Sequence, residues 1–388
     1  MEKILDKKFG RRGFLKAAAA GVAAAALAPS ILGDMRHAHA EVRNFPVKSA
    51  TWSEVKKMTP QQMAESTKLY QPCFDYLMDK AKNLKDSNLR KIAVDGLKNP
   101  VSRVLERVPS KSDKQKVYNK LLDAGYIKSS DTLEGVFPPD KGVGKAPASF
   151  EAAPGGGWGG HHAYPGGLSE HVATDLQTAL AIEEIHQQAY GYSKDVETLT
   201  AAILLHDNTK PWIFQWKKDN SLLPETKIAG TGCHHVQAIA DVMYRGLDPK
   251  LVVALADSHT PPRPGKEEAQ VVGWIKAAAI IAGVDASKYL GPTGETIPLP
   301  RRAEGFLVTL GDGDWVLTGP VNVATNDVLK KIAKKVYKMS DKDLAGKPFF
   351  TLRDYLFSQR SALALFQIWC DQGEDALEAE VKKIVKPE

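Results

Sequence analysis

The amino-acid sequence predicts an all-α fold. Apolar residues recur at helical spacing through most of the chain, and residues 168–290 contain five such stretches in succession. No run of alternating apolar and polar residues separates these stretches, as a sheet would require. Amphipathic helices bury their apolar faces against one another, so we expect a helical bundle in this part of the chain.

The first 40 residues have the pattern of an export signal. Arg11-Arg12-Gly13-Phe14-Leu15-Lys16 resembles a twin-arginine signal, although Gly10 stands where Ser or Thr is usual. An alanine-rich apolar run covers residues 17–32, and Ala38-His39-Ala40 offers a cleavage site. We therefore expect the twin-arginine translocation machinery to export the chain to the periplasm. The run has too few strongly apolar residues for an anchor, so we expect no membrane anchor in the mature chain.

Charge and cysteine content narrow the class of function. The whole chain has a net charge of +6, but residues 1–40 carry seven basic and three acidic side chains, which leaves +2 for the remainder. A near-balanced charge gives no strong nucleic-acid signal, because such partners require a basic surface. Cys73, Cys233 and Cys370 lie far apart, so neither a disulfide framework nor a thiolate metal site is expected.

Composition divides the chain into four parts. After the signal at 1–40, residues 41–150 are expected to form an N-terminal helical cap that ends in a Pro/Gly-rich linker. Residues 151–290 contain the five helices and form the central domain. Residues 291–388 form a C-terminal extension.

The C-terminal extension has a less regular pattern. Two apolar runs flank Gly311-Asp312-Gly313-Asp314, which predicts a small β-hairpin over residues 305–321. Two helices are expected after it, near 324–338 and 351–371.

The central helices bring His and Asp residues to helix ends. His206-Asp207 closes the helix expected over 196–206, and His171 lies on the helix before it. His234-His235 opens the third helix, and His259 closes the fourth. A metal of borderline hardness accepts imidazole and carboxylate together, so this recurrence predicts a metal site.

These residues carry a resemblance to a known family. The run His161-His162-Ala163-Tyr164-Pro165-Gly166-Gly167-Leu168-Ser169-Glu170-His171, followed by the His206-Asp207 doublet, resembles the HD superfamily of metal-dependent phosphohydrolases. The resemblance covers about residues 158–290 and is closest to a subgroup that includes HD-type exoribonucleases and relaxase-associated HD domains. It implies an HD-type helical bundle over residues 151–290 and hydrolysis of a phosphoester, for example of a nucleotide.

The resemblance also implies a set of metal ligands. His171 matches the first family histidine, His206 and Asp207 match the doublet, and Asp285 matches the last aspartate. Members with two metals have extra histidines, which His259 and one of His234 and His235 match. The apolar pattern that follows this pair favours His235.

Further residues near the doublet are expected to take part in the chemistry. Many family members read HD-x-G-K, whereas this chain reads His206-Asp207-Asn208-Thr209-Lys210, which leaves the orientation of Lys210 open. We expect Asp207 to orient or deprotonate the water and Lys210 to offset the developing negative charge. His161 and His162 follow a glycine-rich loop and are expected to contact the substrate or protonate the leaving group. Four aromatic residues that could stack on a base are more typical of a core: Tyr164, Trp212, Phe214 and Trp216.

The nitrogen and oxygen ligand set fits one or two divalent ions of Mn, Fe, Zn, Ni or Mg. The expected function is an exported, metal-dependent phosphohydrolase that attacks a small-molecule phosphoester with metal-activated water. Two alternatives stay open, an HD-type di-iron oxygenase and a non-catalytic HD module that binds a nucleotide or a metal. Iron content with oxygen consumption would identify the first, and tight ligand retention without turnover would identify the second.

Overall fold

The computed structural model describes residues 46–142, 145–300 and 303–388. The export signal expected at residues 1–40 lies outside these ranges. The chain separates by its contacts into two units, residues 1–46 and 47–388, and the second unit is described below. Its secondary structure is almost entirely helical, which confirms the predicted all-α class.

The helices and strands follow one another along the chain without a large sheet. The N-terminal elements are β1 (Ala50–Thr51), α3 (Trp52–Val55), α4 (Pro60–Glu65), α5 (Gln71–Lys82), α6 (Ser87–Lys98), α7 (Val104–Arg107), α8 (Lys111–Asp123), α9 (Leu133–Val136) and the short 3-10 helix η1 (Phe150–Ala152). The central elements are α10 (Gly167–Tyr190), α11 (Val196–His206), α12 (Lys210–Ile213), β2 (Lys227–Ile228), β3 (Thr231–Gly232), α13 (Cys233–Tyr244), α14 (Pro249–Ala256), α15 (Lys266–Ala282) and η2 (Ala286–Tyr289). The C-terminal elements are α16 (Glu304–Asp312), α17 (Trp315–Tyr337), α18 (Asp341–Leu344), α19 (Lys347–Gln359), α20 (Ala362–Gln372), α21 (Glu374–Ile384) and β4 (Val385–Lys386).

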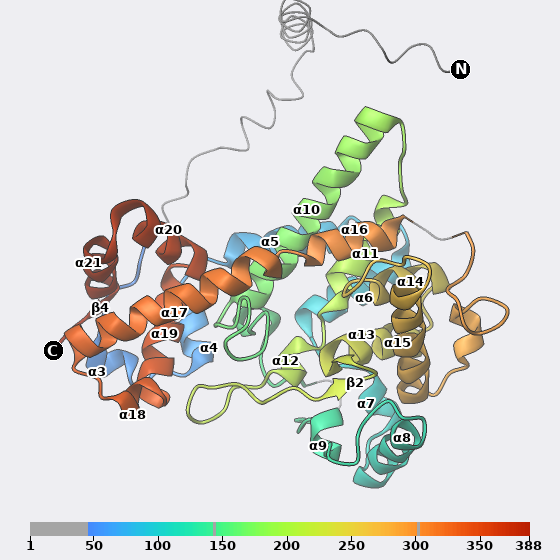
Figure 1. Cartoon of the computed structure of the whole chain (residues 1–388), viewed down its shortest axis with the longest axis horizontal. Coiled ribbons are helices and arrows are strands. Elements are labelled where there is room, and N and C mark those ends of the chain that lie inside the picture. Colours follow the sequence, from blue (N-terminus) through green and yellow to red (C-terminus); the bar gives the residue numbers. More distant parts are fainter. Residues whose placement is uncertain (1–45, 143–144, 301–302) are drawn as a thin grey trace, which may run out of the picture. The chain divides into compact units, whose positions relative to one another are not determined.

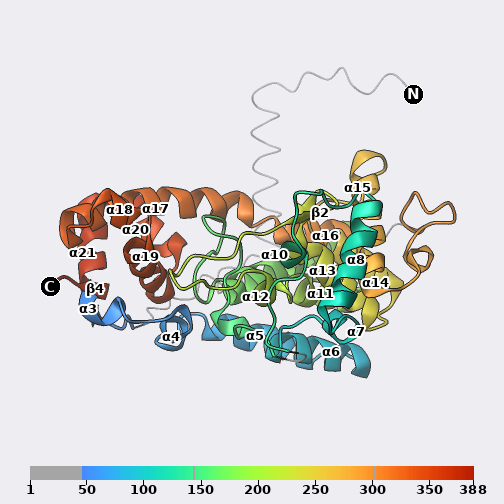
Figure 2. The same cartoon turned by 90° about the horizontal axis from the view of Figure 1, so that it is seen from below.

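The main core contains the five helices expected from the sequence. α13 packs on α15, α11 packs on α14, and α10 packs on α5, α11 and α16 (Figures 1 and 2). Local signals set the helix starts: Asp195 caps α11 by accepting from the Thr198 amide, and Asp248 caps α14 ahead of Pro249. The burial of apolar stripes then holds these helices in one bundle.

A second core joins the two ends of the described chain. α3 and α4 pack on α19, and β1 pairs in parallel with β4, with Ala50 opposite Val385. Figures 1 and 2 both show α3 beside β4. The N-terminal part expected as a single cap therefore contributes to both cores, because residues from Leu77 onward pack with the main bundle.

The hairpin expected over residues 305–321 is wrong, because this segment is helical. α16 buries Leu307, Val308 and Gly311 on one side and exposes Phe306 and Leu310 on the other, which is helical spacing. Figure 1 shows α16 followed by α17, which leads from the main core to the second core. The helix expected near 324–338 is the second half of α17, and the one expected over 351–371 is two helices, α19 and α20.

Two further expectations concern the membrane and the cysteines. Within the described ranges, no helix has both the length and the apolar character that crossing a membrane requires. Cys73, Cys233 and Cys370 form no disulfide with one another.

Candidate metal centre

The candidate metal centre lies where α10, α11 and α16 meet. Its buried side chains come from one turn of α10 and from the ends of the other two helices: His171, Asp175, His206, Asp207 and Asp312. Donor atoms of His171, Asp175, His206 and Asp312 all lie within 4.8 Å of one another. A single metal ion could contact donors this close together.

Asp207 faces histidines on both sides. Its Oδ2 atom lies 3.0 Å from His171 Nε2 and 3.2 Å from His206 Nε2. Its Oδ1 atom lies 3.7 Å from His234 Nε2. The carboxylate therefore stands between the first histidine pair, His171 and His206, and a histidine of α13.

Asp312 is placed in the same way. Its Oδ1 atom lies 3.4 Å from His171 Nε2 and 3.6 Å from His206 Nε2, and its Oδ2 atom lies 3.8 Å from His259 Nε2. His234 and His259 form the second histidine pair, with ring centroids 5.1 Å apart. Each of the two carboxylates thus turns one oxygen toward the first pair and the other oxygen toward the second pair.

Protein oxygens contact the Nδ1 atom of three of the histidine rings at the centre. His206, His234 and His259 each place Nδ1 against a protein oxygen, which orients the ring and leaves Nε2 for the centre. Their partners, at 2.5–2.7 Å, are the Ile203 carbonyl, the Glu225 carboxylate and the Thr231 hydroxyl.

His235, which the sequence favoured over His234, does not face the centre. Its Nε2 lies 3.1 Å from the Ala256 carbonyl oxygen, and its Nδ1 lies 3.1 Å from the Ser258 hydroxyl. Its ring stacks on His259 with centroids 4.0 Å apart. Neighbouring residues of a helix point about 100° apart, so only one of two adjacent histidines can face the centre.

Asp285, expected as the last ligand, lies away from these groups on an exposed turn. Its carboxylate accepts hydrogen bonds from the Ser287 amide at 2.9 Å and the Ser287 hydroxyl at 2.7 Å, and so caps η2. Asp312, and not Asp285, is the aspartate that faces the histidine pairs. Gly311 allows α16 to approach α10 closely enough for Asp312 to reach the histidines. A Cβ at residue 311 would lie 2.7 Å from the Asp175 carbonyl oxygen of α10.

Charge and burial act in opposite directions at the first pair. Burial disfavours a charged imidazole, yet the Asp175 carboxylate raises the pKa of His171 to about 9. Asp207 likewise raises the pKa of His206 well above its usual range. Burial would raise the pKa of Asp207, but His206 and Lys210 hold it well below its usual range. Without metal, this cluster therefore holds protons that a bound cation would replace.

Asp175 and His259 show the effect of burial more directly. Burial raises the pKa of Asp175 well above its usual range, and the neighbouring His171 opposes this shift only in part. Burial also lowers the pKa of His259 to about 4. His259 is therefore neutral near pH 7, which is the form that binds a metal.

The buried donor atoms fit a metal ion. Both oxygens of Asp175, both ring nitrogens of His171 and the Nε2 atom of His206 are enclosed without a hydrogen bond among the described residues. An unsatisfied buried polar group costs about 1–3 kcal/mol. A divalent cation that accepts nitrogen and oxygen ligands would satisfy one nitrogen of His171, the Nε2 atom of His206 and an oxygen of Asp175 together.

Lys210 is buried beside the centre. Its Nζ lies 2.5 Å from Asp207 Oδ2 and also donates a hydrogen bond to the Gly155 carbonyl. Where the family pattern has a glycine, the Thr209 hydroxyl donates to the His234 carbonyl at 2.9 Å. These contacts hold the segment that follows α11 in one position. Lys210 balances the charge of Asp207 and links it to the glycine-rich loop through Gly155.

His161 and His162 lie next to the first pair. Their ring centroids are 4.7 Å and 5.3 Å from that of His171, and the three residues form a second group that could hold a metal. His162 is enclosed, with Nε2 3.5 Å from Asp314 Oδ2. His161 lines an open cavity, so it is the one placed to reach a substrate.

The glycine-rich loop before these histidines is closely packed. The Gly155 amide donates to the His162 carbonyl at 2.8 Å, and a Cβ on Gly155 would lie 2.7 Å from the His162 Cβ. Trp158 packs on Phe350 and under the Arg353 guanidinium, which lies 3.9 Å from the indole centroid. The glycines allow this close approach of two backbone segments.

A cavity of about 420 Å³ opens onto the centre. Five of the groups described above line it: His161, Lys210, His234, His259 and Asp312. The volume is within the range of small-molecule sites, about 300–1,000 Å³. The four aromatic residues considered above lie in the protein interior, with Tyr164, Trp212 and Phe214 buried and Trp216 half-buried.

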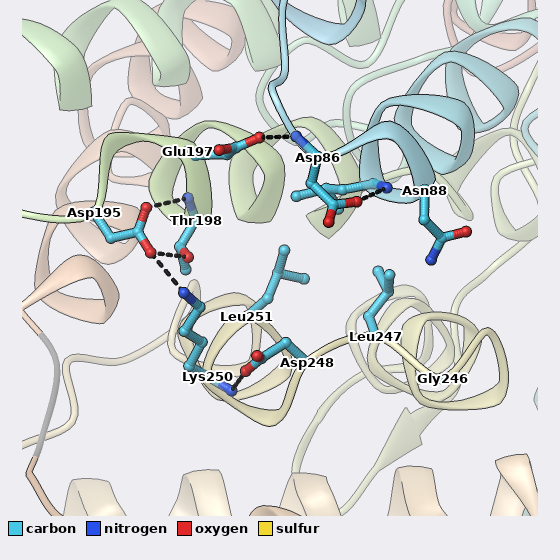
Figure 3. A pocket seen from close by; sticks show the side chains of 11 residues that line it. Asp86, Asn88, Asp195, Glu197, Thr198, Gly246, Leu247, Asp248, Lys250 and Leu251 are labelled. Atoms are coloured by element: carbon cyan, nitrogen blue, oxygen red, sulfur yellow. Dashed lines mark hydrogen bonds and ion pairs between the residues drawn. The ribbon is translucent and has the colours of Figure 1, made fainter.

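A separate cavity of about 320 Å³ contains none of the expected site residues (Figure 3). It lies among the N-termini of three helices, whose N-caps Asp86, Asp195 and Asp248 line it. Each carboxylate accepts from an amide of its own helix, and Asp195 also pairs with Lys250 Nζ at 2.8 Å (Figure 3). These acids stabilise helix starts.

The chain is similar to a curated protein. The chain is 26% identical over 205 residues to the dihydroneopterin 2′,3′-cyclic phosphate phosphodiesterase of Methanocaldococcus jannaschii, a stretch that covers 52% of this chain and 67% of that protein. No family model matches the chain, and no solved structure matches it. A phosphodiesterase is a hydrolase of phosphoesters, so the expected enzyme class, a phosphohydrolase, is confirmed at this level.

Proposed function

We propose that the protein is a phosphodiester hydrolase with a dinuclear centre of divalent metal ions. The positions of Asp207 and Asp312 carry the proposal, because each carboxylate faces both histidine pairs. The two histidine pairs and the two carboxylates would hold the ions.

The bound ions supply Lewis acidity toward a phosphoryl oxygen and lower the pKa of a coordinated water. The chain's own residues align the centre. Asp175 Oδ2 lies 3.3 Å from His171 Nδ1, and Glu225 orients His234 in the same way. Lys210 balances the charge of Asp207 at 2.5 Å.

His161 lines the cavity and would contact the reacting ester. Burial lowers its pKa well below the usual range, so the ring is neutral near pH 7. A neutral imidazole keeps one N–H donor, which can hydrogen-bond the leaving oxygen. This modifies the role expected from the sequence, where a loop histidine protonates the leaving group.

The relative's name points to the first substrate class to test. The relative is a phosphodiesterase of dihydroneopterin 2′,3′-cyclic phosphate. We infer a small cyclic phosphodiester for this chain, which the cavity of about 420 Å³ would accommodate.

The test combines metal content with turnover. Purified protein is expected to bind two equivalents of metal by elemental analysis and to hydrolyse 2′,3′-cyclic nucleotides after loading with Mn, Fe, Zn, Ni or Mg. Asp312→Ala should lose metal and activity together, because Asp312 contacts both pairs. Oxygen consumption without phosphodiester turnover would replace the proposal with the di-iron oxygenase, and ligand retention without either activity would replace it with a binding module.

Export to the periplasm is part of the same proposal and is supported by Arg11-Arg12 ahead of the alanine-rich run. Arg11→Lys with Arg12→Lys should keep the precursor in the cytoplasm, because the guanidinium pair is read as a shape and not only as charge. Normal periplasmic yield of the double variant would contradict the twin-arginine route.

A further inference from the structure

Trp315 is exposed at the cavity that opens onto the metal centre. It lines this cavity together with Asp312 and His259, and 54% of its surface is accessible. The other tryptophan of the cavity, Trp274, is buried edge-on against His235 and His259. Among the described residues that line the cavity, Trp315 therefore offers the indole that is still largely open to solvent.

The backbone explains why this indole lies so near the centre. Gly313 and Asp314 both have right-handed helical φ and ψ, and the Val316 amide donates to the Gly313 carbonyl at 3.1 Å. Asp312 and Trp315 are thus three residues apart on a helical turn. Side chains at this spacing lie on the same face, about 5–6 Å apart at Cβ. The turn that brings Asp312 to the histidine pairs also brings Trp315 to the cavity.

Several other residues that line the cavity are polar. Thr231, Thr260 and Gln270 line it with hydroxyl and amide groups. Gln270 is exposed, so its amide is accessible to a ligand. Amides and hydroxyls can hydrogen-bond the edge of a heterocycle whose face lies on an aromatic ring.

We propose that Trp315 stacks on a planar heteroaromatic ring of the substrate while the phosphoryl group lies at the metal centre. The substrate class is therefore a phosphoester that carries a purine-like ring. This inference rests on the proposed function for the position of the phosphoryl group. Trp315 determines specificity, and the chemistry belongs to the histidines and aspartates.

The test compares a sugar phosphate that carries a heteroaromatic ring with one that does not. Guanosine 5′-monophosphate and ribose 5-phosphate share the sugar phosphate, and calorimetric titration of manganese-loaded protein gives the affinity of each. Wild-type protein should bind the nucleotide more tightly. Trp315→Ala should reduce this preference by about 5- to 150-fold, the range expected for losing one base–aromatic stack. Trp315→Phe should restore most of it.

Leu317→Ala is the matched control, because Leu317 is 57% exposed on the same helix and does not line the cavity. It should retain the wild-type preference. Equal affinity of wild-type protein for the two phosphates, or a preference in Trp315→Ala within about two-fold of wild type, would overturn the inference. Titration requires no turnover, so a lack of phosphodiester hydrolysis would contradict the proposed function separately.

Discussion

Two buried aspartates of the metal centre should respond in opposite directions when their charge is removed from the metal-free protein. Asp207→Asn should lower the free energy of unfolding, because the Lys210 ammonium, 2.5 Å from Asp207 Oδ2 and buried, loses its counter-charge. Removing one partner of a buried ion pair costs about 3–5 kcal/mol. Asp175→Asn should instead leave the stability unchanged or raise it, since burial of the Asp175 carboxylate outweighs its ion pair with His171 Nδ1 at 3.3 Å and raises the Asp175 pKa well above its usual range.

The pKa shifts give the pH dependence of both effects. The pKa of Asp207 is lowered in the folded protein, so its contribution to stability is complete above the unfolded pKa of about 4 and is lost as the pH falls further. The pKa of Asp175 is raised, so its contribution decreases as the pH rises above about 4. The benefit of Asp175→Asn should therefore be larger at pH 7 than at pH 4.

Urea denaturation of chelator-treated protein at pH 4, 5.5 and 7 measures both effects, with circular dichroism as the probe. The double variant Asp207→Asn with Lys210→Met should recover part of the loss, because both members of the pair are then removed. Asp207→Asn as stable as wild type at pH 7, or Asp175→Asn several kcal/mol less stable, would refute the charge assignment.

Three further predictions concern the metal itself. A metal that binds His171 must displace its proton, and the Asp175 carboxylate raises the pKa of His171 to about 9 against the effect of burial. Apparent metal affinity should therefore increase from pH 6 to 9 in chelator competition, and a flat profile would contradict this. His234→Ala should reduce the metal content from two toward one, whereas His235→Ala should keep both ions and lower the thermal midpoint, because His235 packs within the core. Asp312→Ala should remove the metal, whereas Asp285→Ala should keep it and at most weaken the cap of η2. Elemental analysis of the two variants decides between the two aspartates.

The sequence predicted the helical class and the first part of the centre because both depend on local patterns. Apolar spacing of 3.6 residues defined the five central helices. His171 and His206-Asp207 stood at helix positions that the family resemblance specifies, and the structure places the Nε2 atoms of both histidines 3.0–3.2 Å from Asp207 Oδ2. Asp175 was missed, although an acid one turn after His171 was visible in the sequence.

Tertiary packing decided which of several equivalent residues reaches the centre. Asp285 and Asp312 both follow an apolar segment. The helix before Asp285, α15, packs on α13, whereas α16 packs on α10, and the close contact at Gly311 brings Asp312 to the first pair. His234 and His235 are adjacent, and only the position of α13 against α11 and α14 determines which ring faces inward. Spacing along the chain gives the direction of a side chain relative to its own helix. The neighbour that the side chain meets depends on how the helices pack, which involves contacts far apart in sequence.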